Sequence, residues 1–404
     1  MRRAAICRRR PRCSPFLPSC VLPHRQFSSA SGLHGLDASQ LKIIRKGGEP
    51  TPLPPLDTLV FGRTFSDHML DVDWDVNEGW RAPVIRPFQN LSIHPAASSL
   101  HYALQCFDGM KAYKDDSGRI RMFRPDMNAR RLLLSSQRLG LPSFDELQLV
   151  ECIKALLSVD SSQVPQKDGY SMYIRPTSIA TQPTLGVGPP SQTKLFVILS
   201  PVGPYYPTGF KPVQLLADTH YIRAWPGGTG DRKVGANYGP TILPQTLGAK
   251  KGYSQMLWLF PEGDDYRLTE VGTMNLFILW KNEQGEKELV TEPLGDLILP
   301  GVTRDSIIKL AQKMHDIKVS ERPVYMKKDF LKAVAEKRIL EVFGAGTAAV
   351  VSPVDRIGFD GVDYPIPVDP DNPSAGIGPL AKKLLKELND IQYGRVPHEW
   401  SWLV

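Results

Sequence analysis

The longest apolar runs in the sequence, such as Leu195–Leu199 and Met274–Trp280, have the length of single β-strands. A helix that crosses a bilayer needs about 20 apolar residues, so the sequence predicts no transmembrane helix. Predicted strands and helices alternate irregularly and lack the regular strand–helix–strand repeat of a parallel sheet. We therefore expect an α+β fold, and 404 residues are enough for two or more domains.

A stretch rich in proline and glycine, Pro201–Pro204, ends a predicted strand near the middle of the chain. After it we place an interdomain linker. The predicted segments are a targeting peptide at residues 1–30, an extended lead-in at 31–58, a small α/β domain at 59–206, the linker at 207–212 and a large domain at 213–404. Predicted helices span Asp126–Arg138, Phe144–Leu157, Asn237–Ala249 and Asp305–Met314. Thr303 is the expected N-cap of the last helix.

The net charge of +7 originates at the N-terminus. Residues 1–36 contain seven arginines and no acidic residue; removing these seven from the 49 basic residues leaves 42, equal to the 42 acidic residues. A neutral body lacks the basic surface that a nucleic-acid-binding protein needs. The arginine-rich, acid-free head is typical of a transit peptide for the mitochondrial matrix, with cleavage expected near Phe27. A basic tail that binds acidic partners or membrane surfaces is the alternative.

Cysteine is scarce beyond this head, which holds three of the five cysteines. The other two, Cys106 and Cys152, are too few for a disulfide framework or a structural zinc site. We therefore expect a reducing compartment, two buried thiols and no metal site.

Gly227–Lys233 is the first candidate for a chemical role. A glycine-rich loop that ends in lysine suggests a phosphate cradle, but the Walker spacing fails because Val234 follows the lysine. Most such loops are turns with a surface lysine. The alternative is a lysine at the mouth of a cleft, which can form an imine if burial or a cationic neighbour lowers its pKa.

Two further segments add to this candidate. Glu270 lies in an apolar, strand-like context, where a buried carboxylate needs a charged or hydrogen-bonded partner such as an arginine. Phe343–Ala348 contains two glycines beside a threonine, an arrangement found both in tight turns and in nests that bind phosphate or carboxylate. An imine-forming lysine, a carboxylate for a pyridinium nitrogen and an anion-binding backbone are together the requirements of pyridoxal phosphate.

From near Leu59 to the C-terminus the chain resembles the branched-chain aminotransferases of fold-type IV, in their mitochondrial form. The matching stretches are Val60–Leu70, Ser99–Gln105 with Phe107, Tyr173–Pro176, Arg223–Trp225, Gly235–Gly239, Thr269–Asn275, Leu299–Val302 and Ile391–Gly394. The resemblance implies a two-domain enzyme with its active site in the cleft between a small α/β domain and a larger α+β domain. It also implies reversible, ping-pong transamination of leucine, isoleucine and valine with 2-oxoglutarate, which gives branched-chain 2-oxo acids and glutamate.

The resemblance further implies which residues are catalytic. Lys233 matches the lysine that forms the Schiff base and shuttles the proton, Glu270 the acid paired with the pyridine nitrogen, and Tyr238 the tyrosine that donates to the phenolic oxygen of the cofactor. Arg131 matches the phosphate-binding arginine, and guanidinium suits a phosphate better than ammonium does. The other residues implied for cofactor binding are Thr273, Leu299, Val302, Thr303 and Thr347.

The implied substrate pocket is aromatic, although plain core packing is the alternative for each aromatic residue taken alone. Its walls match Phe61, Tyr102, Phe107, Tyr173 and Tyr205. Thr273 and Ala348 match groups that bind the substrate carboxylate, and Arg175 matches the partner for the second carboxylate of glutamate. Leu185 and Val187 match a loop that reaches the pocket of the neighbouring subunit, which implies a homodimer.

The sequence departs from the family pattern in two places. Asp108 stands where glutamate is common, a shortening that we expect the fold to tolerate. Mammalian members carry a redox-active Cys-x-x-Cys where this chain has Ala349–Ser352, so a thiol switch at this place is excluded.

Two alternative functions are another fold-type IV activity (D-amino acid transamination or aminodeoxychorismate cleavage) and a non-catalytic scaffold. The first does not account for the aromatic and Thr269–Asn275 stretches, and the second does not account for the retained lysine, glutamate, tyrosine and arginine.

Overall fold

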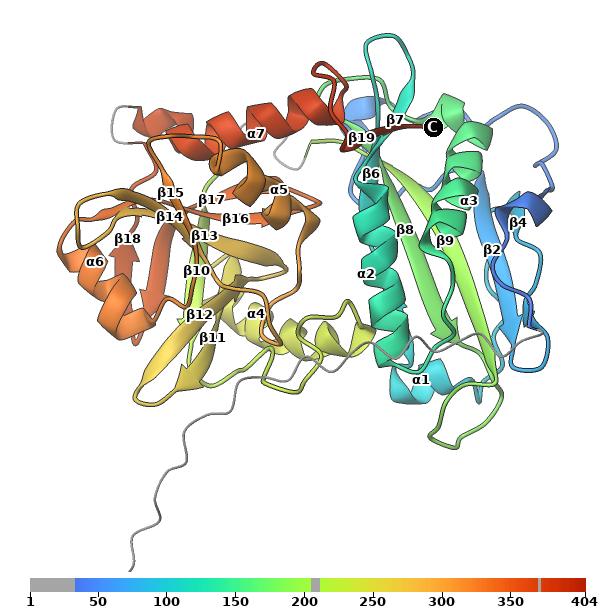
Figure 1. The fold of residues 1–404 in the computed structure, drawn as a ribbon, viewed down its shortest axis with the longest axis horizontal. Coiled ribbons are helices and arrows are strands. Elements are labelled where there is room, and N and C mark those ends of the chain that lie inside the picture. Colours follow the sequence, from blue (N-terminus) through green and yellow to red (C-terminus); the bar gives the residue numbers. More distant parts are fainter. Residues whose placement is uncertain (1–32, 205–210, 370–371) are drawn as a thin grey trace, which may run out of the picture. The chain divides into compact units, whose positions relative to one another are not determined.

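Two β-sheets form the framework of the computed structural model, which describes residues 33–204, 211–369 and 372–404 (Figure 1). With their helices they make an α+β fold, as predicted. The predicted targeting peptide (1–30), Tyr205 and most of the predicted linker (207–212) lie outside the described residues. Within the described ranges, none of the helices is both long enough and apolar enough to cross a membrane.

The first sheet contains strands from the N-terminal half together with the last strand of the chain. Its order is β1-β4-β2-β9-β8-β6-β7-β19, with β3 paired to β2 and β5 paired to β8. The strands are β1 (Lys42–Ile43), β2 (His68–Asp75), β3 (Gly79–Trp80), β4 (Val84–Pro87), β5 (Gln105–Phe107), β6 (Met110–Lys114), β7 (Ile120–Phe123), β8 (Ser171–Ala180), β9 (Gln192–Val202) and β19 (Ser401–Leu403). Because β1 and β19 belong to it, this sheet extends beyond residues 59–206 at both ends.

The second sheet is formed by strands β10 to β18. Its order is β12-β11-β10-β17-β16-β13-β14-β15, with β18 paired to β17. The strands are β10 (Val213–Asp218), β11 (Gln255–Glu262), β12 (Asp265–Val271), β13 (Met274–Lys281), β14 (Lys287–Thr291), β15 (Lys318–Glu321), β16 (Ile339–Gly346), β17 (Val350–Phe359) and β18 (Val362–Pro365). In the tight β12–β13 hairpin Glu270 lies opposite Asn275. All of these strands fall within residues 213–404, and the division into domains at 207–212 remains a prediction.

Helices lie over both sheets, and the longer helices bury apolar residues. The helices are α1 (Ser98–Tyr102), α2 (Pro125–Arg138), α3 (Glu146–Val159), α4 (Ile242–Lys250), α5 (Val302–Ala311), α6 (Lys332–Ala335) and α7 (Pro379–Gln392). On α2 and α3, Leu132, Leu149 and Ile153 are fully buried in one cluster with Ile174 of β8 and Val197 of β9. Burying a leucine or isoleucine side chain stabilises the fold by about 1.5–3 kcal/mol.

A second hydrophobic cluster links the two sheets. It contains the stacked rings of Phe277 and Phe343 from the second sheet, and Leu384 of α7. It also contains Tyr113 of β6 in the first sheet, whose ring centroid lies 5.0 Å from that of Tyr393 at the end of α7. This packing sets β6 of the first sheet close to α7, and it positions the cavity described below.

Two predicted helix boundaries are wrong. Thr303 is not the N-cap of α5: the helix begins at Val302, and its N-cap is Gly301, in an extended conformation without a side-chain capping bond. The predicted helix Asn237–Ala249 is an α-helix only from Ile242, since the residues before it form two 3₁₀ turns, Gly235–Asn237 and Gly239–Thr241. Glycine and Pro240 disfavour a regular α-helix in this segment.

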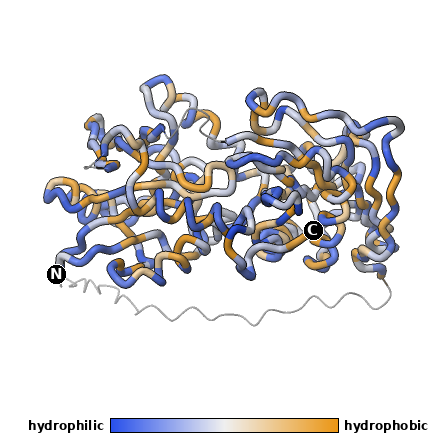
Figure 2. Tube along the Cα trace, turned by 90° about the horizontal axis from the view of Figure 1, so that it is seen from above, coloured by the Kyte–Doolittle hydropathy of each residue, from blue (hydrophilic) through white to orange (hydrophobic). Residues whose placement is uncertain are grey.

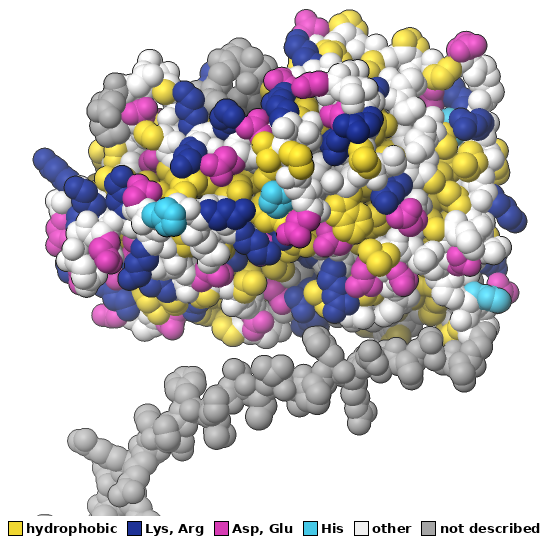
Figure 3. All heavy atoms as spheres, turned by 45° about the horizontal axis from the view of Figure 1, so that its top comes forward, with side chains coloured by type: hydrophobic (Ala, Val, Ile, Leu, Met, Phe, Trp, Pro, Cys, Tyr) yellow, Lys and Arg dark blue, Asp and Glu magenta, His cyan; other side chains and the backbone are white. Residues whose placement is uncertain are grey.

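The hydropathy along the chain and the charges on one face are those of a globular protein without an excess of one charge. Apolar and polar residues alternate along the trace in Figure 2, as in elements that bury one face. On the face shown in Figure 3, Lys and Arg side chains are interspersed with Asp and Glu. This face therefore has no one-sign patch of the kind that binds nucleic acid.

Candidate active site

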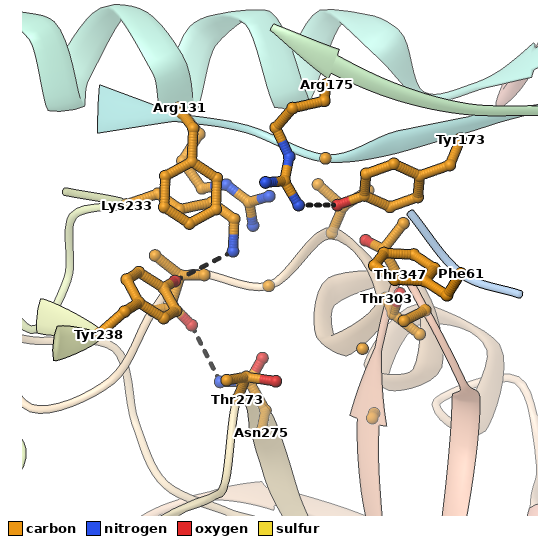
Figure 4. A pocket seen from close by; sticks show the side chains of 18 residues that line it. Phe61, Arg131, Tyr173, Arg175, Lys233, Tyr238, Thr273, Asn275, Thr303 and Thr347 are labelled. Carbon is orange, nitrogen blue, oxygen red and sulfur yellow. Dashed lines mark hydrogen bonds between the residues drawn. The ribbon is translucent and has the colours of Figure 1, made fainter. Parts of the chain in front are cut away.

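A cavity of about 350 Å³ is lined by residues from both sheets (Figure 4). Of the residues proposed from the sequence, it brings together Phe61, Phe107, Arg131, Tyr173, Arg175, Lys233, Tyr238, Thr273, Leu299, Val302, Thr303, Thr347 and Ala348. It also includes five residues that were not named individually as site residues: Gly109, Asn275, Gly301, Ala345 and Gly346. Ala345 and Gly346 lie in Phe343–Ala348, the segment that the sequence offered as an anion-binding nest or a tight turn. Asn275 and Gly301 lie inside the Thr269–Asn275 and Leu299–Val302 stretches, which were the signals that could have identified them.

Both backbone groups of Lys233, its N–H and its carbonyl, form hydrogen bonds to other elements. Its N–H donates to Ser135 Oγ at 2.9 Å, and its carbonyl accepts from the N–H of Phe107 at 3.0 Å. Its ammonium Nζ donates to Tyr238 Oη at 3.1 Å and lies 5.0 Å from the centroid of the Phe107 ring. The lysine is thus directed into the cavity beside a tyrosine hydroxyl and is not a surface lysine at the end of a turn.

The glycine-rich loop before Lys233 is fixed by one amide and one close backbone approach. Asn237 Nδ2 donates to the carbonyls of Thr229 and Arg232 at 2.7 and 2.8 Å. Gly230 passes so close to the chain that a Cβ there would lie 2.3 Å from the carbonyl oxygen of Asp296. Glycine is therefore required at this position for packing, and the loop has one defined path to the lysine.

Glu270, on β12, lies behind Asn275 and Leu299 and is 2% exposed. Its Oε1 accepts from the N–H of Leu299 at 2.8 Å and from Asn275 Nδ2 at 3.2 Å. Its Oε2 forms an ion pair with Arg223 Nη2 at 3.0 Å, but without the geometry of a hydrogen bond. Burial raises the pKa of Glu270, and Arg223 opposes this shift most strongly. The carboxylate therefore keeps one oxygen able to accept a hydrogen bond.

Arg131, on α2, is buried and forms a two-bond pair with Asp108. Its Nε and Nη2 donate to the two carboxylate oxygens at 2.9 and 2.8 Å, and its Nη1 donates to the carbonyl of Pro300 at 3.1 Å. The shorter side chain of Asp108 thus still reaches both nitrogens. The neighbouring Arg130 is exposed and pairs with Glu146, and it does not line the cavity.

The N-terminus of α5 and the turn after β16 form one end of the cavity, which we call the anion-binding end because its groups suit an anion. Val302 and Thr303 begin the helix, and Thr347 lies in the turn. The first N–H groups of a helix have no partner within the helix and carry a partial positive charge, which favours a bound anion. Gly301 permits this arrangement, since a Cβ there would lie 2.1 Å from Asn275 Oδ1.

Aromatic rings form the opposite wall. The Phe61 and Tyr173 rings meet edge to face at 4.8 Å, and those of Phe107 and Tyr238 lie 5.0 Å apart. Arg175 lies over the Phe107 ring at 4.7 Å and donates from Nη2 to Tyr173 Oη at 3.0 Å. An apolar wall with one cation can accept both an aliphatic side chain and a carboxylate.

Three of the proposed residues lie elsewhere. Tyr102, Leu185 and Val187 do not line the cavity and are 39%, 62% and 78% exposed. The hydroxyl of Tyr102 donates to the carbonyl of Leu185, so the two segments contact each other. Cys106 and Cys152 are buried, as expected, and burial raises the pKa of both thiols to about 12.

Comparison with known proteins identifies the family. The family described as amino-transferase class IV matches residues 105–357, which is most of the chain. The chain belongs to the class IV aminotransferases.

This aminotransferase is 54% identical over 382 residues to the branched-chain-amino-acid aminotransferase of Dictyostelium discoideum, with coverage of 94% of this chain and 98% of the relative. It is 48% identical over 392 residues to the mitochondrial branched-chain-amino-acid aminotransferase of Bos taurus, with coverage of 96% of both chains. The crystal structure of the branched-chain amino acid aminotransferase from Thermobaculum terrenum in its PLP form has a TM-score of 0.63 and 22% identity, and the match covers 82% of this chain and 97% of that one. The aminotransferase therefore has the fold-type IV architecture.

Class IV aminotransferases depend on pyridoxal phosphate, and the cavity of this aminotransferase fits that cofactor. The unsatisfied oxygen of Glu270 suits a ring N–H, and Lys233 supplies an amine at hydrogen-bond distance from Tyr238. Arg131 and the α5 N-terminus suit a phosphate. In the described part of the chain, no group of three or more His, Cys, Asp and Glu residues gathers as a metal site would require.

Proposed function

We propose that this aminotransferase reversibly moves the amino group of leucine, isoleucine and valine to 2-oxoglutarate by a ping-pong mechanism. The proposal rests on one observation: Lys233 Nζ lies 3.1 Å from Tyr238 Oη in a cavity that Arg131 and an aromatic wall also line. The buried Glu270 accepts hydrogen bonds from Asn275 and Leu299, which line the same cavity. The relatives named above act on branched-chain amino acids according to their names.

The cofactor supplies an electron sink for the carbanion that forms at the substrate Cα. Lys233 would hold the cofactor through its amine and would move the proton at the substrate Cα. Glu270 would pair with the protonated ring nitrogen, and Tyr238 would donate to the phenolic oxygen. Arg131, with Thr273, Leu299, Val302, Thr303 and Thr347, would hold the cofactor in place.

Substrate side chains lie against the aromatic wall formed by Phe61, Phe107 and Tyr173. Thr273 and the turn at Ala348 bind the substrate carboxylate. Such a wall discriminates modestly among leucine, isoleucine and valine, because one methylene in an apolar pocket changes binding by about 1–3 kcal/mol. Leu185 and Val187 belong to a loop that reaches the pocket of the neighbouring subunit in the proposed homodimer, and Tyr102 contacts this loop through the carbonyl of Leu185.

The direct test is a titration of the purified protein with L-leucine, followed by absorption spectroscopy. We expect the visible band of the bound cofactor to disappear and 4-methyl-2-oxopentanoate to accumulate in stoichiometric amount, since half of a ping-pong reaction needs no second substrate. 2-Oxoglutarate should restore the band. A band that D-leucine bleaches and L-leucine does not would contradict the proposal.

Replacing Arg175 with methionine should separate the two substrates. Arg175 is the cation of the aromatic wall, and methionine retains the apolar contact with Phe107. We expect the KM for 2-oxoglutarate to rise roughly 10- to 100-fold, the range of a hydrogen bond to a charged group, while the KM for leucine changes little. Arg130→Met, which removes an exposed arginine, is the control. An equal rise for both substrates would indicate general damage to the pocket.

We also propose a mitochondrial matrix location after removal of the N-terminal segment. The seven arginines before Leu36 support it, as does the similarity to a relative that is named mitochondrial. N-terminal sequencing of the protein isolated from mitochondria should begin near Ser28. An intact Met1 on that protein would contradict the proposed cleavage.

A further inference from the structure

A second lysine of the cavity region has no part in the proposed mechanism. Lys111, on β6, is only 8% exposed. Its Nζ donates to the carbonyl of Ala348 at 2.8 Å, and among the described residues it takes part in no ion pair. This contact crosses from the first sheet to the turn after β16, which we assign to substrate carboxylate binding.

A buried ammonium without a counter-charge is costly for the fold. Desolvation penalises the charged form by several kcal/mol per ion, and a single carbonyl does not offset that penalty. Burial alone lowers the pKa of Lys111 to about 8. An apolar side chain of the same length would pack at this place without that cost, so stability does not explain the lysine.

Lys111 lies directly behind the anion-binding end of the cavity. It lines a small cavity of about 10 Å³ together with Val302, Thr303 and Thr347, and these three also line the main cavity. Gln392 faces the same small cavity, where its Oε1 is buried without a hydrogen-bond partner. Val302, Thr303 and Thr347 therefore border both the main cavity and the small cavity that Lys111 lines.

A phosphate bound at this end would meet less positive charge than it carries negative charge. The charge of Arg131 is already matched by Asp108, through two hydrogen bonds in a buried pair. The helix dipole of α5 contributes roughly half an elementary charge, whereas a phosphate monoester carries about −1.5 to −2 at neutral pH. Lys111 is a buried cation at this end to which the described residues offer no counter-charge.

We propose that Lys111 is the counter-charge for the oxyanion held by the α5 N-terminus and the turn after β16. This oxyanion is either the phosphate of the cofactor or the carboxylate of the substrate. The proposal rests on the function proposed above, because both anions come from it. Lys111 would then contribute to binding, while its buried charge would destabilise the protein that has no bound anion.

The test compares Lys111→Met and Lys111→Gln with the wild type. Methionine removes both the charge and the donor, whereas glutamine removes the charge and keeps an amide donor for Ala348. Lys114→Met is the matched control, since Lys114 is on the same strand and donates to one carbonyl, that of Ser161, at 3.0 Å. The readouts are the affinities of the apoenzyme for pyridoxal phosphate and for pyridoxal, the KM and kcat for leucine, and the apoenzyme melting temperature.

If the phosphate is the anion, both Lys111 variants should bind pyridoxal phosphate roughly 10- to 100-fold more weakly and pyridoxal unchanged. If the carboxylate is the anion, cofactor affinity should be unchanged, while the KM for leucine rises by the same factor and kcat changes little. In either case apo Lys111→Met should melt at least as high as the wild-type apoenzyme, because an unpaired buried charge has been removed. Lys114→Met should behave as wild type.

Three results would overturn the inference. The first is wild-type affinity and KM in both Lys111 variants. The second is wild-type behaviour of Lys111→Gln alone, which would assign the effect to the hydrogen bond with Ala348. The third is a lower apoenzyme melting temperature with equal losses for pyridoxal phosphate and pyridoxal, as a structural role predicts. A wild-type protein that binds no pyridoxal phosphate would instead contradict the proposed function itself.

Discussion

Lys233→Ala is expected to lower the transamination rate by roughly 10³-fold or more, since it removes the residue that carries the cofactor and transfers the proton. Pyridoxal phosphate should still bind without a covalent bond, because Arg131, the α5 N-terminus and Glu270 remain. The measurements are the leucine turnover rate and the absorption spectrum of the purified variant.

Borohydride reduction gives an independent check on this lysine. In the wild type, reduction should fix the cofactor to Lys233, and peptide mass spectrometry should locate it there; in Lys233→Ala no lysine should carry it. Lys250→Ala, at the exposed end of α4, serves as the control and should retain wild-type turnover. Normal turnover in Lys233→Ala, or cofactor found on another lysine, would refute the assignment.

Glu270→Gln should lower kcat by roughly 10²-fold and leave the KM for leucine nearly unchanged. A neutral amide cannot stabilise the positive charge of a protonated ring nitrogen, and this interaction acts on the chemical step more than on substrate binding. The variant should also be less stable, because Arg223 loses the carboxylate that lies 3.0 Å away; breaking a buried pair costs about 3–5 kcal/mol. Steady-state kinetics and thermal unfolding measure the two effects.

A second variant, Glu292→Gln, separates the loss of kcat from the loss of stability. Glu292 is buried, forms an ion pair with Arg267 and does not line the cavity. Burial raises its pKa as it does for Glu270. This variant should lose stability by a similar mechanism and keep its kcat. If both glutamine variants lost the same kcat, the loss in Glu270→Gln would be an effect of unfolding and not of chemistry.

Local patterns in the sequence were enough to predict most of the secondary structure near the cavity. The predicted helix Asp126–Arg138 corresponds to α2, and the strand-sized run Met274–Trp280 lies within β13. These predictions succeed because the burial of one face repeats with the period of the element. The N-cap at Gly301 was missed because the preference for Thr303 is a local propensity, whereas Gly301 is required by the nearby side chain of Asn275.

Contacts between distant residues were not predictable from the sequence in the same way. Ser135 holds the backbone of Lys233, and Arg223 pairs with Glu270, although the partners in both pairs are far apart in the sequence. A serine in an amphipathic helix carries no signal that its hydroxyl meets a peptide N–H from another element. Resemblance to a family identified Arg223 as part of a matching stretch without giving its partner.

The amino-acid sequence by itself determined the types of residue available for the chemistry, the α+β class and the order of most elements. Only the tertiary structure decided that β19 returns to the first sheet, that Arg131 is neutralised by Asp108, and that Lys111 lies at the anion-binding end without an ion-pair partner among the described residues. The physical reason is that periodicity reports which face of an element is buried, while charge balance depends on which residues meet there. That meeting is fixed by packing between elements that are distant along the chain.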